Sequence, residues 1–332
     1  MAVLVTGAAG FIGFHVAQTL LARGEDVIGV DNLNDYYDVN LKNARLAQLL
    51  QQPKFRFQKL ELADFDALRD GLAKAGVDRI VHLAAQAGVR YSLTHPHAYL
   101  HANITGHLNV LELARQLSPF MHLVYASSSS VYGGNTKLPF AETDRVDTPV
   151  SLYAATKKAD ELISQCYSHL YRIPQTGLRF FTVYGPWGRP DMAMWQFTDA
   201  IIKDQPIKVF NHGDMRRDFT FIDDIVAGVI ACLDRPPVDD GREYLAGSNA
   251  PHRVYNIGNH RSEPLLRMIE VLEQAIGREA IKQMEPMQPG DVKETYADID
   301  AIQRDTGYAP TTPIDVGVPA FVTWFKHYHG LN

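Results

Sequence analysis

Cysteine and long hydrophobic runs are both scarce in this sequence. Only Cys166 and Cys232 are present among 332 residues, and their spacing matches neither a disulfide framework nor a cysteine metal site. We therefore expect two buried free thiols in a reducing compartment. No apolar run is long enough to cross a bilayer. The chain opens with a strand-like run into a glycine turn rather than with a signal peptide. These absences predict a soluble cytoplasmic protein.

An excess of positive charge is also missing. With 32 Lys and Arg against 38 Asp and Glu, the net charge is -6, which argues against general binding of nucleic acid or anionic membranes and leaves room for a local basic pocket. Histidine pairs with one intervening residue occur at His95/His97 and His327/His329, but no third ligand is evident, so we predict no metal site. The length allows one large domain with a smaller second lobe.

The first thirty residues have the pattern of a dinucleotide-binding turn. A short apolar run over residues 2–6 precedes helical spacing of apolar residues over 11–21, with Gly7, Gly10 and Gly13 between them. Small residues let the backbone approach a pyrophosphate, and the helix N-terminus supplies free N–H groups. A second strand, residues 26–30, ends in Asp31, at the distance where an acid meets a ribose 2′-hydroxyl. A carboxylate there would repel a 2′-phosphate, so we predict NAD as the cofactor; the alternative is a glycine turn without a ligand.

Strand-like and helix-like segments then alternate. Strands are expected at residues 54–58, 79–83 and 121–126, and helices at 64–75, 96–116 and 151–171. This succession predicts an α/β fold with a doubly wound parallel sheet. Ligands of such sheets bind beyond the carboxyl ends of the strands. That rule gathers Gly7, Asp31, the turn at residues 84–86 and the serines at 127–130 around one crevice, with Tyr153 at its rim.

Tyr153 and Lys157 are the candidate catalytic pair. They are four residues apart, so on a helix they lie on the same face. A free phenol has a pKa of about 10 and is a poor base at neutral pH, but a nearby ammonium favours the phenolate. A phenolate can take a proton from a hydroxyl while a cofactor takes the hydride. Most such pairs are surface features, and the neighbouring dinucleotide turn is what favours the catalytic interpretation.

Several motifs together carry a resemblance to a known family. They are the three glycines, Asp31, His82–Ala85, Ser127–Gly133 and the pair Tyr153 and Lys157. This set resembles the extended short-chain dehydrogenase/reductase superfamily. Two further stretches, Asp31–Asp38 and Arg179–Pro190, are similar to nucleotide-sugar epimerases, and most closely to UDP-glucuronate 4-epimerases. The resemblance covers nearly the whole chain.

The resemblance implies a Rossmann-type NAD-binding domain over residues 1–182 and a smaller C-terminal α/β lobe over residues 183–332. That lobe would mainly bind the nucleotide sugar, and some of its segments would return to the first domain. One departure concerns the adenine contact, since Glu61 stands where the family usually has aspartate. The NAD contacts implied are Gly7, Gly10, Phe11, Ile12, Gly13, Asp31, Asn32, Glu61, Leu62, Leu83, Ala84, Ala85, Gln86, Tyr153, Lys157 and Phe180.

The same resemblance assigns catalytic and substrate-binding roles. Tyr153 would be the base, Lys157 its electrostatic partner on the nicotinamide ribose, and Ser128 the hydroxyl that binds the reacting 4′-oxygen. The substrate contacts implied are Ser128, Ser129, Ser130, Tyr153, Thr182, Arg189, Lys208, Phe210, Arg217, Gln288 and Asp291. Arg189 would anchor either a sugar carboxylate or the diphosphate. Relatives dimerise through helices that match residues 96–116 and 151–171, so the resemblance also implies a homodimer.

Residues of the second half are expected to read the nucleotide. Phe210, on a strand at residues 207–210, would lie beneath the uracil. Arg217 would grip the diphosphate, which suits a planar fork on a dianion; alternatively it is a surface arginine paired with Asp218. Asp291, in the loop at residues 288–291, would contact the uridine ribose. Gln288 stands where many relatives have a phosphate-binding arginine, and this departure costs the site a charge.

The serine run discriminates between reactions. In similar dehydratases and decarboxylases, acidic residues occupy one or both positions before Val-Tyr-Gly, whereas this chain has Ser129 and Ser130 there. Without that acid, oxidation and re-reduction at C4′ are favoured over elimination; the alternative is that the run is merely a small-residue strand end. NAD would carry the hydride. Arg189 and Thr182 favour UDP-glucuronate over the alternative of a UDP-glucose/UDP-galactose 4-epimerase. A non-catalytic NAD-binding scaffold protein on the same fold is the other alternative, and the presence of both Tyr153 and Lys157 disfavours it.

Overall fold

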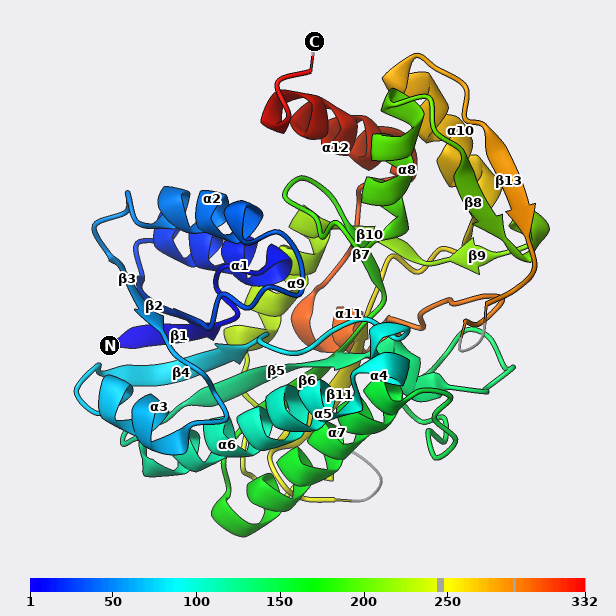
Figure 1. The fold of residues 1–332 in the computed structure, drawn as a ribbon. Coiled ribbons are helices and arrows are strands. Elements are labelled where there is room, and N and C mark those ends of the chain that lie inside the picture. Colours follow the sequence, from blue (N-terminus) through cyan, green and yellow to red (C-terminus); the bar gives the residue numbers. More distant parts are fainter. Residues whose placement is uncertain (244–247, 289–290, 332) are drawn as a thin grey trace.

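A seven-stranded parallel sheet forms the centre of the protein (Figure 1). The structure is a computed structural model that describes residues 1–243, 248–288 and 291–331. The spatial order β3-β2-β1-β4-β5-β6-β11 reverses between β1 and β4, as in doubly wound folds, and it confirms the expected Rossmann-type sheet. The strands are β1 (Ala2–Thr6), β2 (Asp26–Asp31), β3 (Phe55–Lys59), β4 (Val77–His82), β5 (His122–Ser128), β6 (Gln175–Phe180) and β11 (His252–Ile257).

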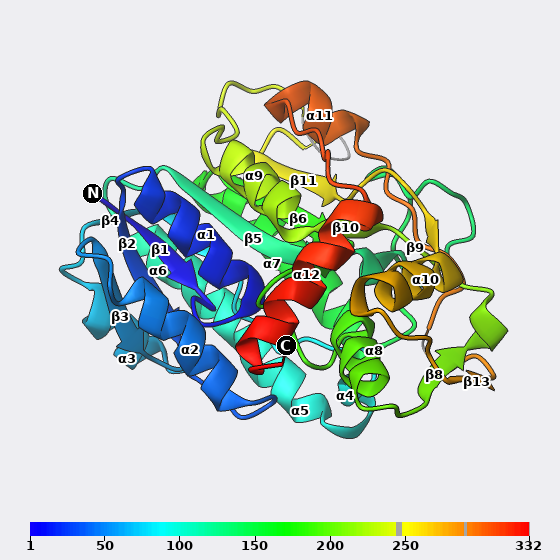
Figure 2. The same cartoon turned by 90° about the horizontal axis from the view of Figure 1, so that it is seen from above.

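Helices cover both faces of this sheet, which is why its central strands are buried on both sides. Figures 1 and 2 show one set of helices on each face. The first set is α1 (Phe11–Ala22), α2 (Val39–Leu49) and α9 (Ile222–Leu233). The second is α3 (Phe65–Leu72), α6 (Gly106–Gln116) and α7 (Leu152–Tyr171).

The helix expected over residues 96–116 is interrupted. It consists of α5 (Pro96–Tyr99), a π-helical segment Leu100–Thr105 and α6, and the short α4 (Tyr91–Thr94) precedes it. Wider turns of this kind are frequent at functional sites. The segment carries Asn103, whose buried amide bonds the backbone of Gln86 and the hydroxyl of Thr156 on α7. The helical region therefore anchors the turn after β4 to the helix that bears Tyr153.

Most of the second half of the chain forms a smaller lobe beside the sheet, although β11 returns to pair with β6 (Figure 1). In this lobe β8 pairs with β13 and β9 with β12, and α10 packs against α8 and α12. The remaining elements are β7 (Thr182–Tyr184), α8 (Ala193–Ile202), β8 (Ile207–Phe210), β9 (Arg216–Arg217), β10 (Phe219–Phe221), β12 (Glu263–Pro264), α10 (Leu265–Ile276), β13 (Lys282–Glu285), α11 (Asp300–Thr306) and α12 (Ile314–Tyr328).

The two cysteines differ in environment. Cys232 on α9 is buried, as expected, and its neighbours are apolar. Cys166 on α7 is exposed, so the expectation of two buried thiols is wrong for that residue. It lies on the side of α7 that faces away from the sheet, where helical periodicity places every third or fourth residue in solvent. Among the described residues, no helix is long and apolar enough to cross a membrane.

Candidate active site

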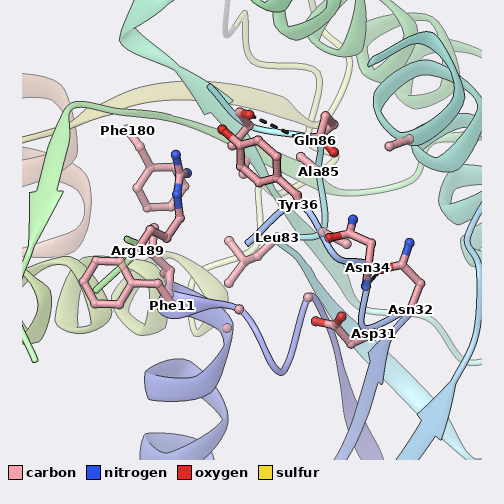
Figure 3. Close-up of a pocket in the computed structure, with 18 of the residues that line it drawn as sticks. Phe11, Asp31, Asn32, Asn34, Tyr36, Leu83, Ala85, Gln86, Phe180 and Arg189 are labelled. Atoms are coloured by element: carbon pink, nitrogen blue, oxygen red, sulfur yellow. Dashed lines mark hydrogen bonds between the residues drawn. The ribbon is translucent and has the colours of Figure 1, made fainter. Parts of the chain in front are cut away.

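A pocket opens at the carboxyl ends of the central strands, close to the point where the strand order reverses (Figure 3). The structure brings most of the expected cofactor and catalytic residues together there. Those that line the pocket are Gly7, Gly10, Phe11, Ile12, Gly13, Asp31, Asn32, Glu61, Leu62, Leu83, Ala84, Ala85, Gln86, Ser128, Tyr153, Lys157, Phe180 and Arg189.

The other expected substrate contacts do not line this pocket. Thr182 lines a small neighbouring pocket, to which Phe11 and Arg189 also contribute. Ser129 and Ser130 form the 3-10 turn directly after β5. The rest, on the smaller lobe, are Lys208, Phe210, Arg217, Gln288 and Asp291. Pro289 and Gly290 of the expected ribose loop lie outside the described residues.

The glycine turn is packed too tightly for side chains. Gly7 has a φ of +71°, and a Cβ there would lie 2.9 Å from the backbone nitrogen of Ala84. A Cβ on Gly13 would lie 2.1 Å from the carbonyl oxygen of Gly7. Only glycine accepts both the conformation and the close approach. The backbone is therefore bare where α1 begins, which suits a pyrophosphate at the helix N-terminus.

Asp31 holds this turn at the end of β2. Its Oδ2 accepts a hydrogen bond from the backbone N–H of Ala9 (3.1 Å), and its Oδ1 accepts one from Leu33 (2.8 Å). Each carboxylate oxygen keeps further acceptor capacity. Glu61, the second acid at this end of the pocket, accepts a hydrogen bond from Asn32 Nδ2 (2.8 Å). Two acceptor carboxylates fit a dinucleotide with a free 2′-hydroxyl and oppose a 2′-phosphate.

Tyr153 and Lys157 both project into the pocket from the first turns of α7. The helix begins where Ser151 Oγ accepts a hydrogen bond from the N–H of Ala154 (3.1 Å), and this N-cap sets where Tyr153 lies. Lys157 Nζ donates to the carbonyl of Ala126 (3.0 Å) and to Asp160 Oδ2 (3.0 Å). An ammonium has three donors, so one N–H of Lys157 is left for the pocket.

Ser128 ends β5 at the floor of the pocket. Its Oγ accepts a hydrogen bond from the N–H of Ser130 (3.1 Å) and donates to Ser130 Oγ (3.1 Å). The preceding residue makes a different contact, since Ser127 Oγ donates to Glu161 on α7 (2.7 Å). The strand end is therefore fixed both to the turn that follows it and to the helix that carries Tyr153.

A buried polar network lies beneath these candidate catalytic groups. Arg179 on β6 donates from Nε (2.8 Å) and Nη2 (2.9 Å) to the two carboxylate oxygens of Glu161, and both side chains are at most 3% exposed. Arg179 Nη1 also donates to the hydroxyl of Tyr132 (3.0 Å), which donates in turn to Asn256 on β11 (2.6 Å). This network joins α7 to three neighbouring strands below the site.

Comparison with known proteins decides the family. A family model described as "NAD dependent epimerase/dehydratase family" matches residues 3–258. The chain belongs to this family. An uncharacterised 37.6 kDa protein of Escherichia coli O111:H- is 53% identical over 99% of both chains. A probable UDP-glucuronate 4-epimerase of Rhizobium meliloti is 47% identical over 98% of this chain and 97% of its own. The crystal structure of a Bacillus cereus UDP-glucuronic acid 4-epimerase, in complex with UDP-glucuronic acid and NAD, superposes with a TM-score of 0.88 at 32% identity, covering 99% of this chain and 100% of its own.

Arg189 is not a free cation in this member of the family. Its Nε and Nη2 donate to Asp191 at 2.9 and 2.6 Å, and Tyr36 donates to the same carboxylate at 3.2 Å. Burial alone would raise the pKa of Asp191, but the paired Arg189 guanidinium holds that pKa below its usual value. Because Asp191 occupies one edge of the guanidinium, only the remaining N–H donors can meet a ligand in the pocket.

Residues 31–45 contribute contacts that sequence reasoning missed. Asn34, Tyr36, Tyr37 and Lys42 line the pocket. Arg45 on α2 is fully buried and donates to the carbonyls of Ala9 (2.9 Å), Trp187 (2.6 Å) and Gly188 (3.1 Å). It thereby joins the glycine turn to the loop that carries Arg189. The Asp31–Asp38 stretch could have indicated some of these pocket residues, because it carried the resemblance to nucleotide-sugar epimerases. Only its first two residues were assigned a role.

Metal ligands do not gather anywhere in the described ranges. No group of three His, Cys, Asp or Glu side chains there is arranged to hold an ion. The ionisable groups of the site have other partners, as Lys157 has in Asp160 and Arg189 in Asp191.

Proposed function

We propose that this protein is an NAD-dependent UDP-sugar 4-epimerase whose substrate is UDP-glucuronate. One observation carries the proposal: Tyr153, Lys157 and Ser128 line the same pocket as the glycine turn and Asp31. Relatives that cover nearly the whole chain bear the UDP-glucuronate 4-epimerase name. The glycine turn, Asp31 and Glu61 fit NAD, so this cofactor is expected in the pocket.

Tyr153 is the proposed proton carrier. Its phenolate oxygen would take the proton of the sugar 4′-hydroxyl, and Ser128 would bind the same oxygen. Bound NAD supplies the hydride acceptor and returns the hydride. Lys157, held by Ala126 and Asp160, has an N–H left to favour the phenolate and to bind a ribose hydroxyl. Tyr153 would return the proton when the hydride is delivered to the opposite face of the sugar.

The positions before Val131 support epimerisation over elimination. Ser129 and Ser130 present hydroxyls there, and no carboxylate stands beside them to assist the loss of water. Glu161, the buried acid that accepts from Ser127, is also bonded by Arg179. The serine run can therefore support oxidation and reduction at C4′ but offers no carboxylic acid of its own to assist elimination.

The nucleotide would extend from this pocket onto the smaller lobe, so we propose residues 1–182 as the cofactor part and 183–332 as the main nucleotide-sugar part. Lys208 and Phe210 share one face of β8 because they are two residues apart on a strand. Arg217 is half-buried, and among the described residues it does not pair with Asp218, the alternative suggested by the sequence. The Asp218 carboxylate instead accepts from the N–H groups of Asn259 and Ala297. Gln288 and Asp291, which follow β13 in the sequence, are the other proposed nucleotide contacts of this lobe.

The decisive experiment compares two substrates. Purified protein is incubated separately with UDP-glucuronate and UDP-glucose, and the products are identified by NMR. UDP-galacturonate should form from the first at least tenfold faster than UDP-galactose forms from the second. Tyr153→Phe should reduce epimerisation at least 100-fold, since it removes the proton carrier, which is worth about 10² to 10⁴ in rate. Full activity of this variant, or faster turnover of UDP-glucose, would contradict the proposal.

Arg189 is the proposed anchor of the sugar carboxylate. Its remaining N–H donors would bind that carboxylate, so Arg189→Leu should lower kcat/KM for UDP-glucuronate by about 10- to 100-fold, the value of about one hydrogen bond to a charged group. Residual turnover of UDP-glucose should change much less. Arg217→Leu is the matched comparison, because a diphosphate contact should affect both substrates alike. Equal losses on the two substrates in Arg189→Leu would refute the carboxylate role.

We also propose a cytoplasmic homodimer. Leu100, Leu108 and Leu162 are 46%, 37% and 58% exposed, although they lie on the packed helical layer formed by the π-helical segment, α6 and α7. An interface there would cover this apolar surface. Sedimentation should give twice the chain mass, and Leu162→Arg should shift it toward the monomer while Leu50→Arg, at an exposed leucine after α2, should not.

A further inference from the structure

Two arginines from distant parts of the chain, Arg90 and Arg217, interact with Asp291, and Arg90 also lies beside Phe210. The guanidinium carbon of Arg90, at the start of α4, lies 4.8 Å from the centre of the Phe210 ring. Arg90 Nη2 also donates to Asp291 Oδ2 at 3.0 Å. Arg90 belongs to the first half of the sequence, whereas Phe210 and Asp291 belong to the smaller lobe. Its position therefore completes a cluster that reaches across the two parts.

Arg217 is the second arginine of this cluster. Its Nη1 donates to the carbonyls of Arg216 (2.8 Å) and Lys293 (3.1 Å), while its Nε and Nη2 make no hydrogen bond to the residues that the structure describes. Burial lowers the pKa of Arg217; the nearby Asp291 opposes this effect and the charge of Arg90 adds to it. The two guanidinium groups are thus close enough to interact electrostatically.

The charges of this cluster do not balance. Arg90 and Arg217 contribute two positive charges, and within the described part of the chain Asp291 is the one carboxylate seen to interact with both. A partly buried arginine next to a like charge is costly unless an anion joins it. Two forked cations and one carboxylate, with an aromatic ring beside Arg90, suit a nucleotide, with the ring under the base and the cations on the phosphates.

We propose that Arg90 is the second diphosphate-binding cation of the nucleotide site and supplies the charge that is missing at Gln288. This inference rests on the proposed function and names a residue that it does not include. In the free protein Arg90 is paired with Asp291. When the nucleotide binds, Asp291 turns to the ribose hydroxyls and Arg90 to the diphosphate.

The exchange of partners is energetically reasonable. The Arg90 side chain is 52% exposed, and exposed ion pairs contribute little to stability. A guanidinium fork on a phosphate forms two charge-assisted hydrogen bonds, which are shorter and stronger than neutral ones. The alternative is a purely structural role, in which Arg90 is a surface arginine that neutralises Asp291 and does not contact the ligand. The two cases differ in how the affinity depends on the phosphates of the ligand.

The test measures the affinities of UDP, UMP and uridine by calorimetry. Arg90→Gln should weaken UDP binding about 10- to 100-fold, the value of losing hydrogen bonds to a charged group. UMP should lose less and uridine less than about twofold. Arg90→Lys should restore part of the UDP affinity, because it keeps the charge and loses the fork. In turnover, Arg90→Gln should raise KM for the UDP-sugar and leave kcat within about threefold.

Arg115→Gln is the matched control. Arg115 lies 4.8 Å from the centre of the Tyr171 ring and pairs with Glu112 at 2.9 Å, so it has the same kind of contacts at another place. Its variant should bind UDP as the parent does. Unchanged UDP affinity in Arg90→Gln, or an equal loss for uridine and UDP, would overturn the inference. A parent protein that fails to bind UDP would instead overturn the proposed function.

Discussion

Removal of Arg179 should destabilise the protein strongly. Arg179→Met would leave the Glu161 carboxylate in the interior without the guanidinium that now bonds both of its oxygens. Burial alone would raise the pKa of Glu161, and the hydrogen bonds from Arg179 hold that pKa below its usual value. Breaking one partner of a buried ion pair typically costs about 3–5 kcal/mol. We expect a loss of that size in the free energy of unfolding.

The expected loss in the free energy of unfolding corresponds to a decrease in the melting temperature. An unfolding entropy of about 2.1 cal/mol/K per residue over 332 residues amounts to about 0.7 kcal/mol/K. A loss of 3–5 kcal/mol therefore lowers Tm by about 4–7 °C, which circular dichroism can measure. Arg69→Met is the control, because the ion pairs of Arg69 with Asp66 and Asp70 are exposed, and its Tm should not change.

A double variant tests whether the unpaired charge is the cause. Glu161→Gln together with Arg179→Met removes both charges, so it should recover part of the Tm lost in the single variant. A shift below about 1 °C in Arg179→Met, or a double variant less stable than both single variants, would refute this account of the network.

Two further predictions concern buried ionisable groups, His122 on β5 and Asp160 on α7. Burial lowers the pKa of His122 to about 4 in the folded protein. The contribution of its neutral ring to the free energy of unfolding is therefore fully present above pH 6.5 and is lost as the pH falls toward 4. The difference in unfolding free energy between the parent and His122→Gln should therefore shift by about 2 kcal/mol against the parent between pH 7.5 and 5. A pH-independent difference between the urea midpoints of the two proteins would contradict this. Asp160→Asn removes the carboxylate that orients Lys157, so kcat should fall about tenfold with the NAD content unchanged; full activity would show that the Ala126 carbonyl is sufficient.

The local parts of the site could be predicted from sequence because their signals are local. The glycine spacing, Asp31 at the end of β2 and the Tyr153–Lys157 interval each lie within a few residues of the element that positions them. Their physical causes are equally short-range, namely the close packing of the turn, the end of a strand and one turn of helix. The roles of these residues remain predictions, whereas their meeting in one pocket is seen.

Other elements were not predicted because their hydropathy patterns resemble those of other structures. Strand β6 was not named in advance: its sequence is half polar, yet all six residues are buried. Its polar side chains are satisfied by distant partners, such as Thr176 by His122 (2.9 Å) and Arg179 by Glu161. The π-helical segment was read as ordinary helix, since an added residue in one turn leaves the apolar spacing on either side nearly unchanged. Hydropathy describes burial and cannot supply these pairings.

The charged contacts of the site also depend on pairings between residues that are distant in the sequence. Arg45 fixes the glycine turn and the loop at residues 187–188 through three carbonyl groups. A single sequence cannot reveal such a pairing, because a carbonyl acceptor is present at every residue. Arg189 was expected from the sequence to bind a ligand anion, and in the fold it is paired with a carboxylate, as is Arg90, which the sequence did not single out. What a ligand meets is therefore the set of donors that these pairings leave over, and only the three-dimensional arrangement defines that set.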